Sequence, residues 1–82
     1  MLIYIWNLSP FISEDDFRQT FEAYGEVSSA IISSTILKDS GQLIRFALIE
    51  MPDQVEAQAA IKNLNRNDLY SQRMMVYQSS EN

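Results

Sequence analysis

The chain has 82 residues, enough for one small domain with a single hydrophobic core and no cross-links. It contains no cysteine and no histidine, which excludes disulfides, the usual zinc sites and acid–base catalysis by histidine. The net charge of −5 argues against strong, non-specific attraction to polyanions. No apolar run is long enough for a signal peptide or a membrane span, so we expect an intracellular, cytoplasmic location.

The first predicted element is a strand over residues 2–6, which are β-branched, aliphatic or aromatic. The turn residues Asn7 to Pro10 end it. Side chains alternate between the two faces of a strand. If Ile3 and Ile5 face the core, Tyr4 and Trp6 therefore share the opposite face.

A helix is predicted over roughly residues 13–24. Ser13 is placed as its N-cap, and three acidic residues follow in the first turn, where the helix dipole favours them. Phe17, Phe21 and Tyr24 have the spacing i, i+4, i+7, which places them on one helical face. Gly25 then provides the C-terminal stop.

Two strands and a turn follow. Residues 27 to about 34 alternate loosely, with Val27, Ala30 and Ile32 expected inward and Ile31 outward. Residues 38–41 predict a turn, so this strand forms a hairpin with the next. The next strand, residues 43–51, has seven apolar residues in nine and turn residues at both ends. Its two faces are both largely apolar: one holds Leu43, Arg45, Ala47, Ile49 and Met51, and the other Ile44, Phe46, Leu48 and Glu50.

A second helix is predicted over residues 53–64. Asp53 and Glu56 have the spacing of a capping box. Its expected core face is Ala57, Ala60, Ile61 and Leu64. After a polar loop, residues 74–77 predict a last strand, with Met74 and Val76 inward and Met75 and Tyr77 outward.

This order, βαββαβ, predicts an α+β fold: a ferredoxin-like sandwich with a four-stranded antiparallel sheet in the order 4-1-3-2 and two helices on one face. We expect residues 1–78 to form one domain and residues 79–82 a short polar tail. The face without helices would expose an apolar, aromatic platform of a size that usually marks a binding site. Its members are Tyr4, Trp6, Ile31, Ile44, Phe46, Leu48, Met75 and Tyr77.

These segments resemble the RNA recognition motif (RRM) family over nearly the whole chain. Residues 3–8, Ile-Tyr-Ile-Trp-Asn-Leu, are similar to the first-strand hexamer of the family, and residues 44–51 lie where its third-strand octamer falls. The first helix, the Gly-x-Val that follows it and the second helix also fit in register. The chain departs from the octamer at Ile44, Arg45 and Leu48, which replace a basic residue, a glycine and an aromatic residue. Trp6 stands where the family usually has a small residue.

The resemblance implies a single-domain protein that binds single-stranded RNA, with bases stacked on the aromatic positions and phosphates at the basic ones. It implies stacking at Tyr4, Trp6, Phe46 and Leu48. Polar or phosphate contacts would come from Asn7, Lys38, Arg45, Arg73 and Tyr77. Because the chain is acidic, we expect weak to moderate affinity.

A protein-docking or self-association surface on the same face is the alternative. A protein-binding branch of the family also has an acidic first helix, but its Arg-x-Phe signature is replaced here by Arg66-Asn67-Asp68. Enzyme activity is not expected, since the loop between the first strand and first helix has neither the arginine nor the glycine of an anion-cradling loop. No cofactor, metal or membrane contact is expected.

Overall fold

The structure, a computed structural model, describes residues 1–69 and 72–79. Every strand and helix that the sequence predicts is present, and a short pair of additional strands lies in what was expected to be a polar loop. No helix in the described ranges is long and apolar enough to cross a bilayer. The elements are β1 (Leu2–Leu8), α1 (Glu14–Glu22), β2 (Ser29–Ile36), β3 (Leu43–Glu50), α2 (Gln54–Leu64), β4 (Asp68–Leu69), β5 (Gln72–Arg73) and β6 (Met75–Gln78).

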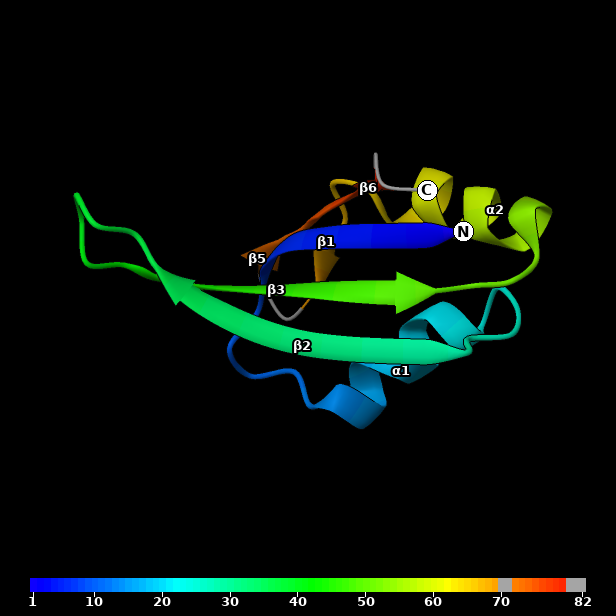
Figure 1. The fold of residues 1–82 in the computed structure, drawn as a ribbon, viewed down its shortest axis with the longest axis horizontal. Coiled ribbons are helices and arrows are strands. Elements are labelled where there is room, and N and C mark those ends of the chain that lie inside the picture. The colour runs from blue at the N-terminus through cyan, green and yellow to red at the C-terminus, as the bar shows by residue number, and fades with distance from the viewer. Residues whose placement is uncertain (70–71, 80–82) are drawn as a thin grey trace.

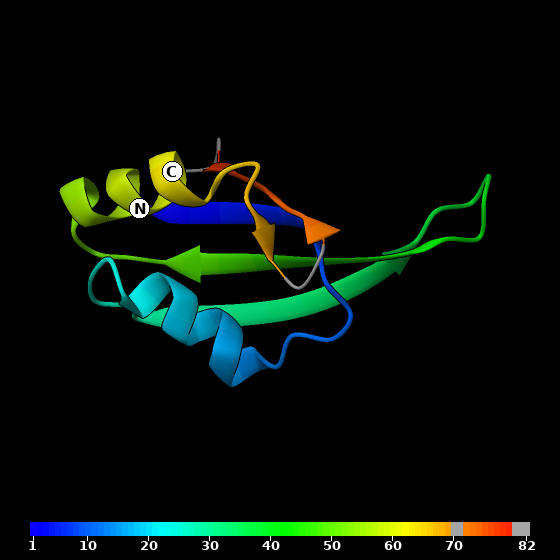
Figure 2. The ribbon, with the colours of Figure 1, turned by 180° about the vertical axis from the view of Figure 1, so that it is seen from behind.

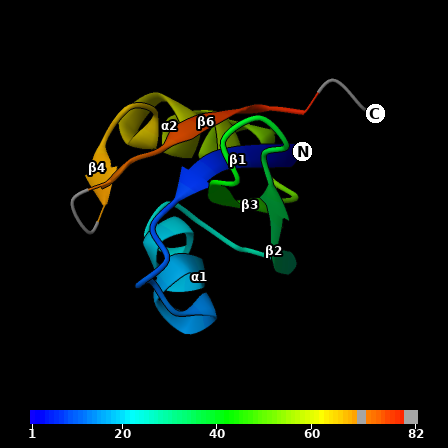
Figure 3. The ribbon, with the colours of Figure 1, turned by 90° about the vertical axis from the view of Figure 1, so that its left-hand side faces the viewer.

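The main sheet has the strand order β2-β3-β1-β6, with every neighbouring pair antiparallel. Because β6 is the fourth strand of this sheet along the chain, the order read from β6 is 4-1-3-2, as predicted. The ferredoxin-like fold is therefore confirmed. Seen from behind, α1 and α2 lie in front of the strands (Figure 2). The end-on view also places both helices on one side of the sheet (Figure 3). The opposite face is the one turned toward the viewer in Figure 1.

The core lies between the sheet and the two helices. The central strands contribute Ile3, Ile5 and Ile49, which have no exposed surface, and α1 contributes Phe17 and Phe21. The two phenylalanine rings meet edge to face, with centroids 5.2 Å apart. On α2 the small residues Ala57 and Ala60 are fully buried, which lets that helix approach the sheet closely. The predicted inward residues of β1, α1 and α2 therefore form the core, except that Tyr24 and Ile61 are only partly buried against it.

Both helix starts follow the sequence signals. The Ser13 hydroxyl oxygen accepts the Asp16 backbone N–H at 3.1 Å, and an Asp53 carboxylate oxygen accepts the Glu56 backbone N–H at 2.9 Å. The reciprocal half of the predicted capping box is replaced by another contact. The Glu56 carboxylate accepts the backbone N–H of Glu26 at 3.3 Å and lies directly over Gly25, where a Cβ atom would collide with it.

The β2–β3 hairpin is longer than the rest of the sheet. Its register is unbroken over all eight residue pairs, from Ser29 opposite Glu50 to Ile36 opposite Leu43. Its far end projects beyond β1 (Figure 1). Leu43 was predicted to point inward. It lies on the helix side by alternation, but it is 57% exposed because the hairpin has run past the helices that would cover it.

Candidate functional site

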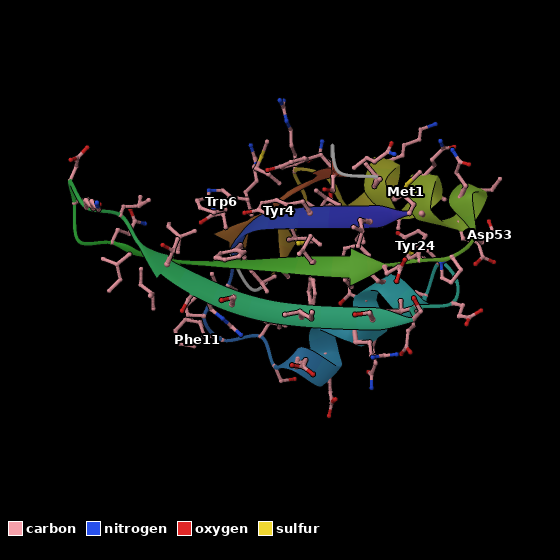
Figure 4. The ribbon with its side chains drawn as sticks, in the orientation of Figure 1. Met1, Tyr4, Trp6, Phe11, Tyr24 and Asp53 are labelled. Atoms are coloured by element: carbon pink, nitrogen blue, oxygen red, sulfur yellow. The ribbon has the colours of Figure 1, made fainter. Side chains whose placement is uncertain are left out.

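Four aromatic rings meet on the face of the sheet that the helices leave uncovered. Tyr4 and Trp6 occupy alternate positions of β1 and therefore project to the same side (Figure 4). Phe46 of β3 lies directly opposite Trp6, and Tyr77 of β6 lies directly opposite Tyr4. Three neighbouring strands thus bring the rings together. We call Tyr4, Trp6, Phe46 and Tyr77 the aromatic cluster.

Three of these rings are nearly parallel. The Tyr4 centroid lies 6.3 Å from that of Trp6 and 6.0 Å from that of Phe46, with interplanar angles of 14° and 15°. Trp6 and Phe46 are 5.8 Å apart at 24°, whereas Tyr77 is tilted by 39° against Tyr4 at 5.3 Å. Tyr4, Trp6 and Phe46 are half-buried, and Tyr77 is 47% exposed. Each ring therefore supports its neighbours while part of its surface reaches solvent.

Aliphatic residues border the aromatic cluster. Leu48 is half-buried and lies opposite both Tyr4 and Ile31, and Ile31 is 59% exposed. Met75, half-buried, lies opposite Trp6. Ile44 requires a correction: alternation places it on this face, but it is only 6% exposed, so it is not part of an open platform. The accessible surface is therefore centred on the rings and on Ile31.

The environment of Tyr4 changes its acidity. Burial disfavours the charged phenolate and raises the pKa of the Tyr4 hydroxyl above its ordinary value, and the nearby Tyr77 raises it further. The Tyr4 hydroxyl therefore remains protonated across the physiological range. Tyr4 therefore presents a neutral ring and a neutral hydroxyl group on this face.

Arg45 lies on the opposite side of the sheet from the aromatic cluster. Its Nη1 donates to the backbone carbonyl oxygens of Ser9 at 2.7 Å and Ile12 at 3.0 Å. These bonds fasten the β1–α1 loop to β3. The same loop is tightened by the Ser9 hydroxyl, which accepts the Phe11 backbone N–H at 3.1 Å. This position gives no support to the predicted phosphate contact of Arg45 and points instead to a role in holding the loop.

The remaining predicted polar contacts lie at the border of the aromatic face. Asn7 forms a bulge at the end of β1, with φ of 68°, and its Nδ2 donates to the Arg73 carbonyl oxygen at 2.9 Å. Arg73 is exposed on β5. The Asn7 hydrogen bond therefore links β1, which contains Tyr4 and Trp6, to the backbone of a cationic residue. Lys38 is exposed in the loop between β2 and β3. All three residues therefore lie toward one end of the sheet, where β1 ends and β3 and β6 begin.

The middle of the uncovered face is uncharged. Alternation assigns hydroxyl side chains to it at Ser33 and Thr35 of β2, which lie opposite Phe46 and Ile44. The one charged residue that β3 adds to this face, among the described residues, is Glu50 at the end of the strand. Stacking and hydrogen bonding, rather than charge, are therefore the interactions that the centre of the face offers.

Two features of this site, the role of the Tyr77 ring and the hydroxyl side chains of β2, were not predicted from the sequence. The prediction placed Tyr77 on the correct face but expected a polar contact, whereas its ring joins the aromatic cluster; the cross-strand position opposite Tyr4 was the missing information. It also left Ser33 and Thr35 unassigned, although the strand period alone sets both of them on the same face as Ile31. The serines had weakened the strand signal, so their positions were not used.

Comparison with known proteins decides the family. The family model described as RNA recognition motif matches residues 3–75, which is most of the chain. The chain belongs to the RNA recognition motif family. The resemblance found in the hexamer, octamer and helices is thereby confirmed, and the strand order agrees with it.

Two curated relatives and two solved structures show the extent of this similarity. The protein provisionally named RNA-binding protein RbpD, from Nostoc sp. (strain PCC 7120), is 30% identical to this RRM over 76 residues, covering 93% of this chain and 79% of the relative. A second Nostoc protein, provisionally named RNA-binding protein RbpF, is 34% identical over 65 residues, covering 79% of this chain and 60% of the relative. RNA-binding protein PG1 superposes with a TM-score of 0.79 at 28% identity, covering 100% of this chain and 96% of that one. The Rna15 RRM with bound RNA (GU) has a TM-score of 0.76 at 21% identity, covering 98% of this chain and 83% of that one, which shows the shared fold alone.

Proposed function

We propose that this RRM binds single-stranded RNA by stacking unpaired bases on the aromatic cluster, without catalysing a reaction. The observation that carries the proposal is the set of rings on the uncovered sheet face, with three of them parallel to within 24°. Family membership and the names of the Nostoc relatives support it. Because the faces of paired bases are already covered in a duplex, single strands fit such a surface best.

The energetics favour weak to moderate affinity. Base–aromatic stacking contributes roughly 1–3 kcal/mol per base. The centre of the face is uncharged, so electrostatic attraction to phosphates is confined to its border, at Lys38 and Arg73. Asn7 and the Tyr77 hydroxyl are placed to hydrogen-bond a strand that crosses from β1 to β6, while Leu48 supplies apolar contact.

An NMR titration of the protein with pools of short single-stranded RNA tests this proposal. We expect chemical-shift changes on β1, β3 and β6 at Tyr4, Phe46 and Tyr77. Tyr4→Leu and Phe46→Leu keep an apolar side chain over the sheet but remove the stacking ring. Each should weaken RNA binding by about 1–3 kcal/mol. Leucine is preferred to alanine because both rings are half-buried.

Phe11→Leu is the matched control. Phe11 is 81% exposed, but it lies in the β1–α1 loop rather than on the uncovered sheet face (Figure 4). Its replacement removes an accessible phenylalanine ring and should leave RNA binding unchanged. If no RNA shifts the sheet resonances even at low salt, where phosphate attraction is least screened, the proposal fails. The aromatic cluster would then be assigned to a protein partner or a homodimer contact.

A further inference from the structure

The outer edge of β2 is an open sheet edge. In the described part of the chain, β2 has one strand neighbour, β3, to which all eight of its residues are paired. The other long side of β2 therefore presents a row of backbone N–H and C=O groups outward. From Ser33 to Ile36 every residue is exposed. A strand of this length, with an unbroken register and an accessible edge, can pair with another strand.

The residues of β2 do not protect this edge. Soluble proteins usually block an exposed edge with lysine, proline, a bulge or a very short strand. The sequence of β2, Ser-Ala-Ile-Ile-Ser-Ser-Thr-Ile, has no charged residue and no proline, and its pairing with β3 has no bulge. By contrast β6, at the other edge, has four residues. Uncharged β-branched residues favour strand pairing.

We propose that β2 pairs antiparallel with β2 of a second copy of this chain, joining the two sheets into one. A two-fold axis that passes between the two copies of Ser33 places these residues opposite each other. The two members of each pair are then both odd-numbered or both even-numbered. Because side chains alternate along a strand, each face of one sheet continues into the same face of the other. In this register Thr35 lies opposite Ile31 of the other copy. Ile36, which is 64% exposed, lies opposite Ala30, so a large side chain meets a small one.

The uncharged edge of β2 is where two copies of this acidic chain can pair with least repulsion between the paired side chains. Each chain carries a net charge of −5, so two copies repel one another over most approaches. The exposed acids of α1, Glu14, Asp15 and Asp16, lie in the helical layer rather than in the sheet. The β2 strands that would pair have no charged side chain. It also satisfies the backbone groups of both edges at once, with no other chain required.

The pairing has a consequence that rests on the proposed function. Since the two-fold axis is perpendicular to the joined sheet, both aromatic clusters lie on the same side of it. A sufficiently long RNA strand would contact the two clusters together, and its affinity would exceed that of a short one through a higher effective concentration. Formation of the dimer itself does not depend on RNA.

Cross-linking tests the arrangement directly, because the chain has no cysteine and a single introduced thiol is unambiguous. Ser33→Cys places two thiols next to the two-fold axis, and mild oxidation should convert this variant largely to a disulfide-linked dimer. Gln58→Cys, at an exposed position of α2, is the control for random collision. Equal rates of cross-linking for the two variants would overturn the proposed pairing.

Sedimentation equilibrium from low micromolar to millimolar concentration supplies the second measurement. We expect a reversible dimer whose dissociation constant rises at least tenfold in Ser33→Lys, which sets two ammonium groups opposite each other. Gln58→Lys adds the same charge away from β2 and should leave the dimer intact. A wild-type chain that stays monomeric throughout, or a dimer lost in Trp6→Leu but kept in Ser33→Lys, contradicts the proposal. Failure here leaves the RNA titration of the monomer unaffected, so the two proposals are tested separately.

Discussion

Arg66 occupies a backbone conformation that is costly for a residue with a side chain. Its φ is 64°, in the left-handed region, and its backbone N–H donates to the Met74 carbonyl oxygen at 2.9 Å. That bond holds the loop between α2 and β4 in place. Left-handed conformation costs a non-glycine residue about 1–2 kcal/mol, because Cβ approaches the carbonyl oxygen too closely.

Arg66→Gly should therefore be more stable than Arg66→Ala by about 1 kcal/mol. Both variants lose the same charge and the same long side chain, so their difference isolates the backbone effect. Urea denaturation followed by tryptophan fluorescence provides the measurement. Equal midpoints in the two variants would show that the loop relaxes to another conformation.

Tyr4 makes stability depend on alkaline pH. Its pKa is raised in the folded state, so between its ordinary value and the raised one the unfolded chain loses this proton while the folded chain keeps it. The contribution is fully present below the ordinary pKa of 10.0 and is lost as the pH rises through the raised value. Relative to Tyr4→Phe, the wild-type chain should lose stability as the pH rises above 10.0, and the loss should level off above the raised pKa. Urea denaturation of both proteins at a series of alkaline pH values measures this difference, and parallel curves would contradict the prediction.

At the residue scale, the period of two along each strand was sufficient to assign the side chains of β1 to the two faces of the sheet. It placed Ile3 and Ile5 inside and Tyr4 and Trp6 on the uncovered face. The period does not give the distance from a strand to its covering layer. For that reason it could not show that Ile44 is buried on the aromatic face or that Leu43 is exposed on the helix side.

At the scale of elements, the β1–α1 loop depends on β3 through one side chain. The Arg45 guanidinium satisfies the carbonyl oxygens of Ser9 and Ile12, and Ser9 itself is 1% exposed. Removal of this charged donor takes a hydrogen bond from both carbonyl oxygens, and the Ser9 oxygen keeps a longer bond, 3.5 Å, from the Ile12 backbone N–H. The loop also includes Ile12, whose side chain is buried in the core. A displacement of the loop would therefore disturb the packing of the core against α1.

Arg45→Ala should lower the free energy of unfolding by about 1.5–3 kcal/mol, the range for hydrogen bonds to charged groups. Lys38→Ala is the control: it removes a cation from the exposed hairpin loop and should leave stability unchanged. The predicted pattern is thus a stability defect at Arg45 without a selective loss of RNA affinity. If Arg45→Ala were as stable as the wild-type chain but bound RNA more weakly, Arg45 would instead be assigned a contact with an RNA phosphate.

Element boundaries followed the strength of the local signals. The helices predicted at 13–24 and 53–64 are found as Glu14–Glu22 and Gln54–Leu64, with the N-caps at the predicted residues. The strand predicted over 27–34 is found at Ser29–Ile36, since its serines blur the alternation. The pair β4–β5 was missed because each strand has two residues, too few for a periodic pattern; in the structure the two strands pair with each other and β5 also contacts β1.

At the scale of the whole molecule, an acidic protein can still bind RNA if its negative charges lie away from the binding face. The exposed acids Glu14, Asp15 and Asp16 belong to α1, which covers the opposite side of the sheet (Figure 2). Repulsion between these carboxylates and a strand on the aromatic cluster is weakened by distance and by salt. In the proposed binding mode, stacking supplies most of the binding free energy, and stacking is insensitive to ionic strength.

The RNA affinity should therefore depend only weakly on salt. For single strands, log K falls with log[salt] at about 0.7 per phosphate neutralised. With Lys38 and Arg73 as the two phosphate contacts, the expected slope is about −1.4, and Lys38→Ala should reduce its magnitude by about 0.7. Titration of one short RNA at several salt concentrations, monitored by Trp6 fluorescence, gives the slope. A much steeper slope would mean that further cations, Arg66 first among them, reach the strand, and that electrostatics rather than the aromatic cluster dominates binding.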